Sequence, residues 1–233
     1  MNISGLQKMT LLDYPGKVAC TVFLGGCNFR CPFCHNSELL DGSAPAVMDE
    51  NGLLAFLKKR QGLLDGVCIT GGEPTLCPDL PGLLRQIREL GYAIKLDTNG
   101  YRPDVLRALV EEGLVDYVAM DIKNSPAAYP DTAGIPGLSL TKLEESIRYL
   151  AEGPVAHEFR TTVVKPLHTP QTIQEMGQWL HALTGGVPKL FLQPFTDRVT
   201  VPFAGLSAPS EEELRDYVNI LSCFVTSVTV RGI

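Results

Sequence analysis

Short hydrophobic, β-favouring runs recur along the chain, and segments with the spacing of amphipathic helices lie between them. Near-continuous hydrophobic runs are typical of strands buried on both faces, and helices usually connect parallel strands. The pattern therefore predicts a parallel sheet covered by helices. The expected strands span residues 18–24, 67–70, 93–96, 117–120, 159–164 and 189–192, and 227–230 would add one more.

The predicted helices carry start and stop signals. Apolar side chains between Leu80 and Leu90 share one helical face, and a glycine follows them as a C-terminal stop. Capping-box spacing, in which serine or threonine precedes glutamate by three residues, occurs at Thr141 and Ser210. Thr169 stands before a proline and is expected to cap a third helix.

The six main strand–helix units are fewer than the eight of a closed TIM barrel. The sequence therefore predicts an α/β protein with a partial, open TIM-like (β/α)6 barrel. We expect a single domain over 1–233, with an N-terminal segment 1–17, a barrel core 18–196, and a C-terminal helix and strand in 197–233. Residues 124–139 are rich in proline, glycine and alanine and are expected to form a long loop after the fourth strand.

Charge and hydropathy narrow the functional class. The chain has 233 residues and a formal net charge of −6 at pH 7, which argues against nucleic acid as its main partner. No stretch approaches the roughly 20 apolar residues of a membrane-spanning helix, and the first residues do not form a signal peptide. We therefore expect a cytoplasmic protein without a membrane partner, whose thiols stay reduced.

Three of the seven cysteines crowd into the segment that follows the first strand. Cys27, Cys31 and Cys34 have C-x3-C-x2-C spacing. Crowded cysteines in a reducing compartment indicate metal or redox chemistry. Because a cubane iron–sulfur cluster takes four ligands, three thiolates would leave one iron open to a substrate.

A zinc-binding knuckle with His35 as fourth ligand is the alternative. Structural zinc sites usually combine two separated ligand pairs, and the sequence has no second pair. His35 also sits directly beside Cys34, which is a poor geometry for chelating the same ion. The other four cysteines are scattered and form no second cluster motif, and Cys20 and Cys68 are expected to be buried in strands.

Polar residues follow the next three strands. Gly71 and Gly72 end the second strand and allow close approach to a ligand, and Glu73 places a carboxylate at the rim. The third strand ends at Asp97 and the fourth at Asp121. Two carboxylates at one barrel mouth need a cation between them, which Lys123, a metal ion or a cationic cofactor would supply.

The cysteine motif, with an aromatic residue before its last cysteine, resembles the signature of the radical S-adenosylmethionine (radical SAM) superfamily. The resemblance implies a [4Fe–4S] cluster on these three cysteines, with S-adenosylmethionine bound to the unique iron. It also places Phe33 beside the adenine, although plain loop packing would explain Phe33 equally. The segment Gly71-Gly72-Glu73 would bind the ammonium group of the cofactor.

Further residues resemble the family of pyruvate formate-lyase activating enzymes. By that resemblance, Asp97 and Asp121 hold a monovalent cation beside the cofactor carboxylate, and Lys123 faces cofactor and substrate. Arg160, on the fifth strand, matches an arginine of the same site. The family's histidine near the end of the sixth strand is missing, and Thr196 or Gln193 stands in its place.

The N-terminal segment 5–17 and the residues flanking the cysteines resemble those of glycyl-radical-enzyme activases. The resemblance is chiefly to the longer type, which acts on anaerobic ribonucleoside-triphosphate reductase. The resemblance implies a low-potential electron donor such as flavodoxin or ferredoxin, reductive cleavage of S-adenosylmethionine, and removal of hydrogen from a glycine of a partner enzyme. Three alternatives stay open: activation of a pyruvate formate-lyase type enzyme, a small-molecule enzyme similar to 7-carboxy-7-deazaguanine synthase, and a non-catalytic metal-binding module.

Overall fold

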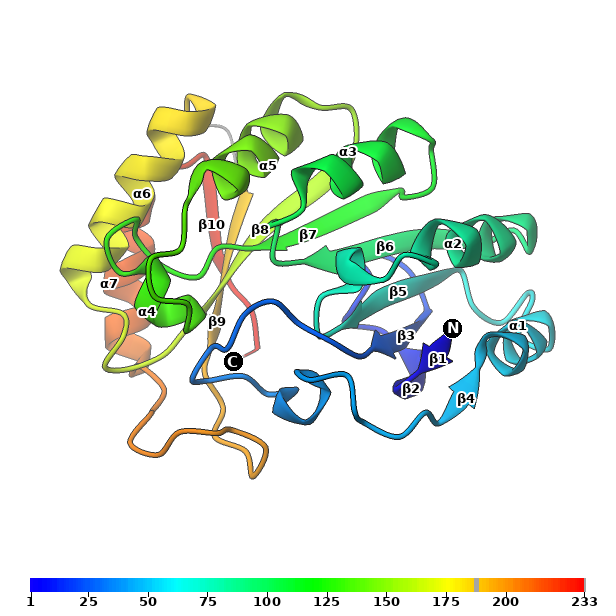
Figure 1. Ribbon diagram of the computed structural model, residues 1–233. Coiled ribbons are helices and arrows are strands. Elements are labelled where there is room, and N and C mark those ends of the chain that lie inside the picture. The colour runs from blue at the N-terminus through cyan, green and yellow to red at the C-terminus, as the bar shows by residue number, and fades with distance from the viewer. Residues whose placement is uncertain (187–188, 233) are drawn as a thin grey trace. The chain divides into compact units, whose positions relative to one another are not determined.

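The computed structural model describes residues 1–186 and 189–232 and has a mixed α/β fold (Figure 1). Every strand expected from the hydrophobic runs is present, within a few residues of its expected bounds. These strands are β3 (Ala19–Leu24), β5 (Gly66–Gly71), β6 (Ala93–Thr98), β7 (Tyr117–Asp121), β8 (Ala156–Val163), β9 (Lys189–Pro194) and β10 (Ser227–Val230). The helices are α1 (Glu50–Lys58), α2 (Leu80–Glu89), α3 (Pro103–Glu111), α4 (Tyr129–Ala133), α5 (Thr141–Glu152), α6 (Pro170–Thr184) and α7 (Glu211–Leu221).

The described residues form two compact units. The first comprises 1–28 and 38–119, and the second comprises 29–37 and the described residues from 120 onward. In the first unit β5 pairs in parallel with both β3 and β6, and in the second unit β9 pairs in parallel with both β8 and β10. The residues of β7 divide between the units. These parallel pairs, with helices between successive strands, confirm the predicted α/β class.

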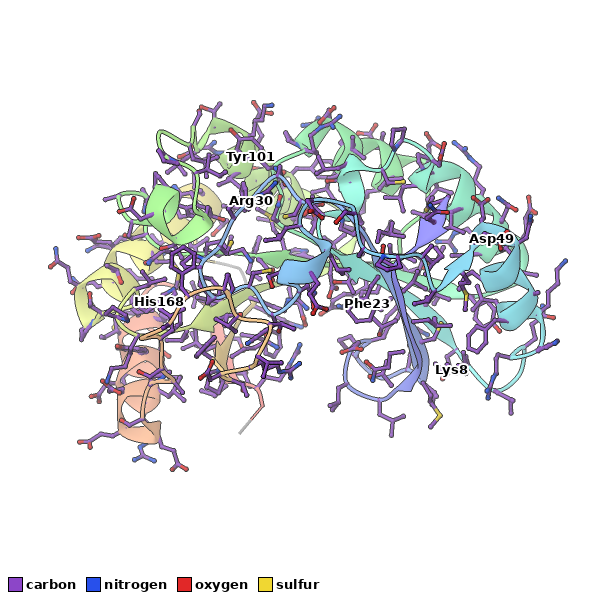
Figure 2. All side chains as sticks on the ribbon, turned by 60° about the horizontal axis from the view of Figure 1, so that its bottom comes forward. Lys8, Phe23, Arg30, Asp49, Tyr101 and His168 are labelled. Atoms are coloured by element: carbon purple, nitrogen blue, oxygen red, sulfur yellow. The ribbon has the colours of Figure 1, made fainter. Side chains whose placement is uncertain are left out.

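Residues 5–17 contain a strand that the sequence pattern does not predict. β2 (Gly5–Thr10) pairs antiparallel with β3, and Lys8 and Phe23 mark the two strands in Figure 2. Two further short strands, β1 (Asn2–Ile3) and β4 (Met48–Asp49), also pair antiparallel. β2 lacks a hydrophobic run because most of its side chains are exposed or half-buried.

In the first unit, α2 shows how the apolar pattern becomes a core. Its buried side chains, all without exposed surface, are Leu80, Leu83, Leu84 and Ile87. Fully burying a leucine or isoleucine side chain stabilises the fold by about 1.5–3 kcal/mol. The predicted glycine stop is Gly91, whose φ of +88° lies in the left-handed region that favours glycine.

In the second unit, two of three predicted caps are confirmed. Ser210 and Thr169 both form capping boxes at the start of α7 and α6. The predicted box at Thr141 is wrong, because Thr141 is already the first residue of α5 and Leu140 is its N-cap without a side-chain bond. The Thr141 hydroxyl instead accepts a hydrogen bond from Ser139 (3.2 Å).

The expected long loop 124–139 contains a short helix, α4, so the loop prediction is only partly right. The helix ends at Gly134, whose φ is +67°. Among all the described residues, no helix has the length and hydrophobicity needed to cross a membrane.

Candidate active site

Cys27 follows β3 in the first unit, and the end of β5 supports the backbone beside it. The Glu73 amide donates to the Gly26 carbonyl oxygen (2.7 Å), and a Cβ on Gly72 would lie 2.1 Å from that same oxygen. Gly71 has a φ of +124°, and its Cβ would lie 2.2 Å from the backbone of β3. Both positions require glycine because the backbones touch. Gly72 therefore packs on the cysteine loop and Gly71 on β3, and their expected close approach to a ligand stays a prediction.

Cys31 and Cys34 lie in the second unit, where they form one turn. The Cys34 amide donates to the Cys31 carbonyl oxygen (3.1 Å), and the Arg30 amide donates to the Ala133 carbonyl oxygen at the end of α4 (2.8 Å). A Cβ on Gly134 would lie 2.1 Å from the Arg30 carbonyl oxygen. The loop 124–139 therefore packs against the cysteine turn. Figure 2 labels Arg30 on this turn.

The chemistry of the three thiols suits an iron–sulfur cluster. Cys31 is buried, and Cys27 and Cys34 are half-buried. Within 1–186 and 189–232, no three His, Cys, Asp or Glu side chains already stand together as a metal-binding group. Three thiols from a single loop are nevertheless the donor set that such clusters take. Phe33 is buried within the same loop, and its place beside an adenine stays a prediction.

Burial raises the pKa of the Cys34 thiol above its ordinary value, and the nearby Lys123 ammonium and Arg30 guanidinium oppose that rise. Positive charge near a thiol favours its thiolate form, which is the form that binds metal. The second unit therefore holds cations where a thiolate ligand needs them.

Glu73 is buried and saturated with hydrogen bonds inside the first unit. Its Oε1 accepts from the Thr75 amide (3.1 Å), the Thr75 hydroxyl (2.5 Å) and the Thr98 hydroxyl (2.8 Å), and its Oε2 accepts from the Asn99 amide (2.6 Å). Asn99 Nδ2 in turn donates to Asn28 Oδ1 (2.8 Å), next to the first cysteine. The carboxylate expected at the rim is instead buried, and its hydrogen bonds connect the ends of β5 and β6 to the cysteine loop. We call this connection a buried tie.

Burial raises the pKa of Glu73, and the hydrogen bonds from Asn99, Thr75 and Thr98 act in the opposite direction. The Glu73 carboxylate thus connects strand ends through hydrogen bonds, a structural role that the Gly-Gly-Glu pattern does not predict. Its expected contact with the cofactor stays a prediction.

Asp97 has a cationic partner that the sequence analysis missed. Lys95 lies two residues earlier on β6 with 1% of its surface exposed, and its Nζ is ion-paired with Asp97 Oδ1. The signal was present, since a lysine interrupts an otherwise apolar strand just before the aspartate. The cation expected beside Asp97 is therefore supplied by its own strand.

Asp121, Lys123 and Arg160 come together in the second unit as expected. Lys123 Nζ donates to Asp121 Oδ2 (2.9 Å), and Arg160 Nε donates to Asp121 Oδ1 (3.1 Å). Burial alone would raise the pKa of Asp121, but the charges of Lys123 and Arg160 outweigh it and hold that pKa at about 2. The group carries one net positive charge, which suits a carboxylate ligand.

His168 and Tyr129 contact the backbone on which Asp121 and Lys123 stand. The His168 Nε2 lies 2.8 Å from the Lys123 carbonyl oxygen, and Nδ1 lies 3.1 Å from both the amide nitrogen and the carbonyl oxygen of Val164. A neutral imidazole with its proton on Nε2 would donate to Lys123 and accept from the Val164 amide, and burial lowers the His168 pKa. The hydroxyl of buried Tyr129 lies 3.4 Å from the Asp121 carbonyl oxygen. His168, labelled in Figure 2, is therefore a positioning residue.

His35 joins the cysteine turn to the loop after β9. Its ring stacks on Phe195 with centroids 5.5 Å apart, and its Nε2 lies 2.7 Å from the Thr196 carbonyl oxygen. The Thr200 hydroxyl donates to the His35 carbonyl oxygen (2.8 Å). Thr196 itself is exposed and Gln193 is half-buried, so the choice between them as the replacement for the family's histidine stays open.

Residues 21–181 match the radical SAM superfamily. The chain belongs to the radical SAM superfamily. This radical SAM protein is 31% identical over 242 residues to MJ1227 of Methanocaldococcus jannaschii, assigned as a glycyl-radical enzyme activating enzyme, which covers 99% of this chain and 96% of the relative. It is 30% identical over 200 residues to a 7-carboxy-7-deazaguanine synthase of Thermococcus kodakarensis, covering 77% of this chain and 75% of the relative.

A solved structure, a domain of pyruvate-formate lyase-activating enzyme from Bacteroides vulgatus, resembles the chain with a TM-score of 0.58 at 20% identity, over 72% of this chain and 99% of that domain. Likeness at this identity concerns the fold alone, and it agrees with the predicted α/β class. Membership of the superfamily makes the protein an enzyme and implies a [4Fe–4S] cluster and S-adenosylmethionine. It therefore favours iron–sulfur chemistry over the zinc-binding alternative.

Proposed function

We propose that this radical SAM enzyme reductively cleaves S-adenosylmethionine and removes a hydrogen atom from a glycine of a partner glycyl radical enzyme. The observation that carries the proposal is the similarity to MJ1227, which extends over 99% of this chain rather than over the cysteine motif alone. The partner we favour is an anaerobic ribonucleoside-triphosphate reductase, because the residues flanking the cysteines resemble its activases. A low-potential donor such as flavodoxin or ferredoxin would supply the electron.

The residues present fit the implied cofactors. Cys27, Cys31 and Cys34 would hold the [4Fe–4S] cluster, which when bound supplies the electron that breaks the C5′–S bond of S-adenosylmethionine. Lys123 and Arg160, fixed by Asp121, offer net positive charge to the carboxylate of the methionine moiety.

The remaining site residues orient these groups. The Glu73 carboxylate binds Asn99, which in turn binds Asn28, and the Glu73 amide binds Gly26, so the backbone on both sides of Cys27 is held. His168 and Tyr129 fix the backbone around Lys123. Glu73, Tyr129 and His168 are buried, which limits the conformations they can adopt. A monovalent cation beside Asp97 and Asp121 stays a prediction of the resemblance, and the Lys95 ammonium is its structural alternative.

The test is anaerobic co-expression with each glycyl radical enzyme of the host. Electron paramagnetic resonance should detect a glycyl radical in one of these enzymes only when the activase is present, and the signal should be absent with Cys34→Ala. A Cys223→Ala variant is the matched control, because Cys223 is exposed and lies outside the motif. If no candidate gains a glycyl radical, the proposed partner class is wrong.

The similarity to 7-carboxy-7-deazaguanine synthase favours a second candidate, a small-molecule radical enzyme. That candidate predicts turnover of a pterin-like substrate by the isolated protein with no partner present. Product formation under those conditions would replace the activase proposal.

A further inference from the structure

Lys95 is the buried cation of the first unit. Its Nζ is ion-paired with Asp97 Oδ1 and lies 3.8 Å from Cys68 Sγ. Cys68 of β5 is directly opposite Lys95 in the parallel register, and Asp97 follows two residues later on the same face of β6. The ammonium group is therefore held from two sides, by its own strand and by the neighbouring one.

Burying an ammonium group is costly unless an anion compensates it. The side chain of Asp97 is 13% exposed, so most of the ion pair is removed from water. A methionine would fill the same space with no charge to desolvate. The presence of lysine at this buried position is thus explained by the negative charge of Asp97.

A monovalent metal ion would offer Asp97 the same single charge as this ammonium group. Lys95 Nζ already takes the place of such an ion on Asp97 Oδ1. In the other unit Asp121 has two cations of its own, Lys123 and Arg160. The described surroundings of Asp97 therefore do not fit the monovalent cation that the family resemblance implied.

We propose that Lys95 is the permanent counter-ion of Asp97 and replaces a monovalent metal ion at this site. Lys95 is a positioning residue: it fixes and neutralises the carboxylate at the end of β6, next to the Thr98–Asn99 segment that binds Glu73. Its effect on S-adenosylmethionine cleavage rests on the proposed function. The replacement of the ion does not, and it is testable in the protein without cluster.

The first experiment compares thermal unfolding of the cluster-free protein in potassium chloride and in tetramethylammonium chloride at equal ionic strength. The wild type should show the same melting temperature in both salts. Lys95→Met should melt lower and should be stabilised selectively and saturably by potassium, which then takes the place of the ammonium group on Asp97 Oδ1. The double variant Lys95→Met/Asp97→Asn should lose that response, and Lys59→Met, at an exposed lysine, should never show it.

Selective stabilisation of the wild type by potassium would overturn the proposal, since it would reveal a metal-ion site beside the lysine. A Lys95→Met protein as stable as the wild type and indifferent to potassium would overturn it as well. If Lys95→Met does not fold, the wild-type comparison alone decides.

The second experiment measures 5′-deoxyadenosine formation by the reconstituted enzyme in the same two salts. The wild type should form 5′-deoxyadenosine at the same rate in both salts. In tetramethylammonium chloride, Lys95→Met should be at least tenfold slower than the wild type, and potassium chloride should partly restore its rate. A wild type that depends on potassium would contradict the role of Lys95. Absence of product in every salt would instead refute the proposed function, while the unfolding comparison would still decide the ion.

Discussion

Replacing Glu73 by glutamine should destabilise the protein although the shape of the side chain is kept. Both carboxylate oxygens accept a backbone N–H, Oε1 from Thr75 (3.1 Å) and Oε2 from Asn99 (2.6 Å). A glutamine has one acceptor oxygen, so its NH2 group must face one of these N–H donors. The Thr98 hydroxyl cannot relieve the conflict, because it donates on the Oε1 side and accepts from the Gly100 amide (3.0 Å).

The size of the effect follows from the bond that is lost. Losing one hydrogen bond to a buried charged group costs about 1.5–3 kcal/mol. Because glutamine is neutral, its burial costs less than that of a carboxylate, which offsets part of this cost. We therefore expect the free energy of unfolding to fall by about 2 kcal/mol. For a chain of this size that loss lowers the melting temperature by roughly 4–8 °C.

The assay is thermal and urea unfolding of cluster-free wild type and Glu73→Gln at neutral pH. Glu112→Gln is the matched control, because Glu112 pairs with Arg85 on the surface and its loss should cost less than about 0.5 kcal/mol. Equal stability of Glu73→Gln and wild type would refute the interpretation of Glu73 as a buried tie.

Three further predictions concern the second unit. Asp121 has its pKa lowered from 3.8 to about 2, so its stabilising effect, at most about 2 kcal/mol, is full above pH 3.8 and is lost as the pH falls toward 2; the advantage of wild type over Asp121→Asn in urea midpoint should shrink across that range. Burial lowers the pKa of His168 from 6.5, so wild-type stability should fall as the pH drops below 6.5, and His168→Gln should show a flatter pH profile. Ser210→Ala should cost about 1 kcal/mol in urea unfolding, whereas Thr141→Ala should cost less than half as much because Thr141 caps no helix; equal costs would refute the assignment of the caps.

Strands and motifs were predictable where one local pattern decides them. β3 and β5 are mostly apolar because they are buried along most of their length, and β10 was predicted with its correct bounds. β2 was missed because an edge strand with exposed side chains needs no hydrophobic run. α4 was missed because five residues containing a proline carry no helical periodicity, and its place is set by contacts with the cysteine turn.

The residues of the candidate site were predictable from the sequence, but most of the interactions between their side chains were not. Asp121, Lys123 and Arg160 lie together, as the family resemblance implied, because the carboxylate attracts both cations. The pairing of Asp97 with Lys95 was not predicted because Lys95 lies inside an otherwise apolar strand, whereas the expected cation, Lys123, follows a strand end. The burial of Glu73 depends on Thr98 and Asn99, more than twenty residues away in sequence, and no local pattern records such contacts.

The most direct test of the central claim is anaerobic reconstitution with iron and sulfide, followed by reduction and addition of S-adenosylmethionine. We predict that the wild type forms a [4Fe–4S] cluster and produces 5′-deoxyadenosine, that Cys31→Ala does neither, and that Cys223→Ala behaves as the wild type. A protein that binds zinc instead of an iron–sulfur cluster and yields no 5′-deoxyadenosine would contradict the account.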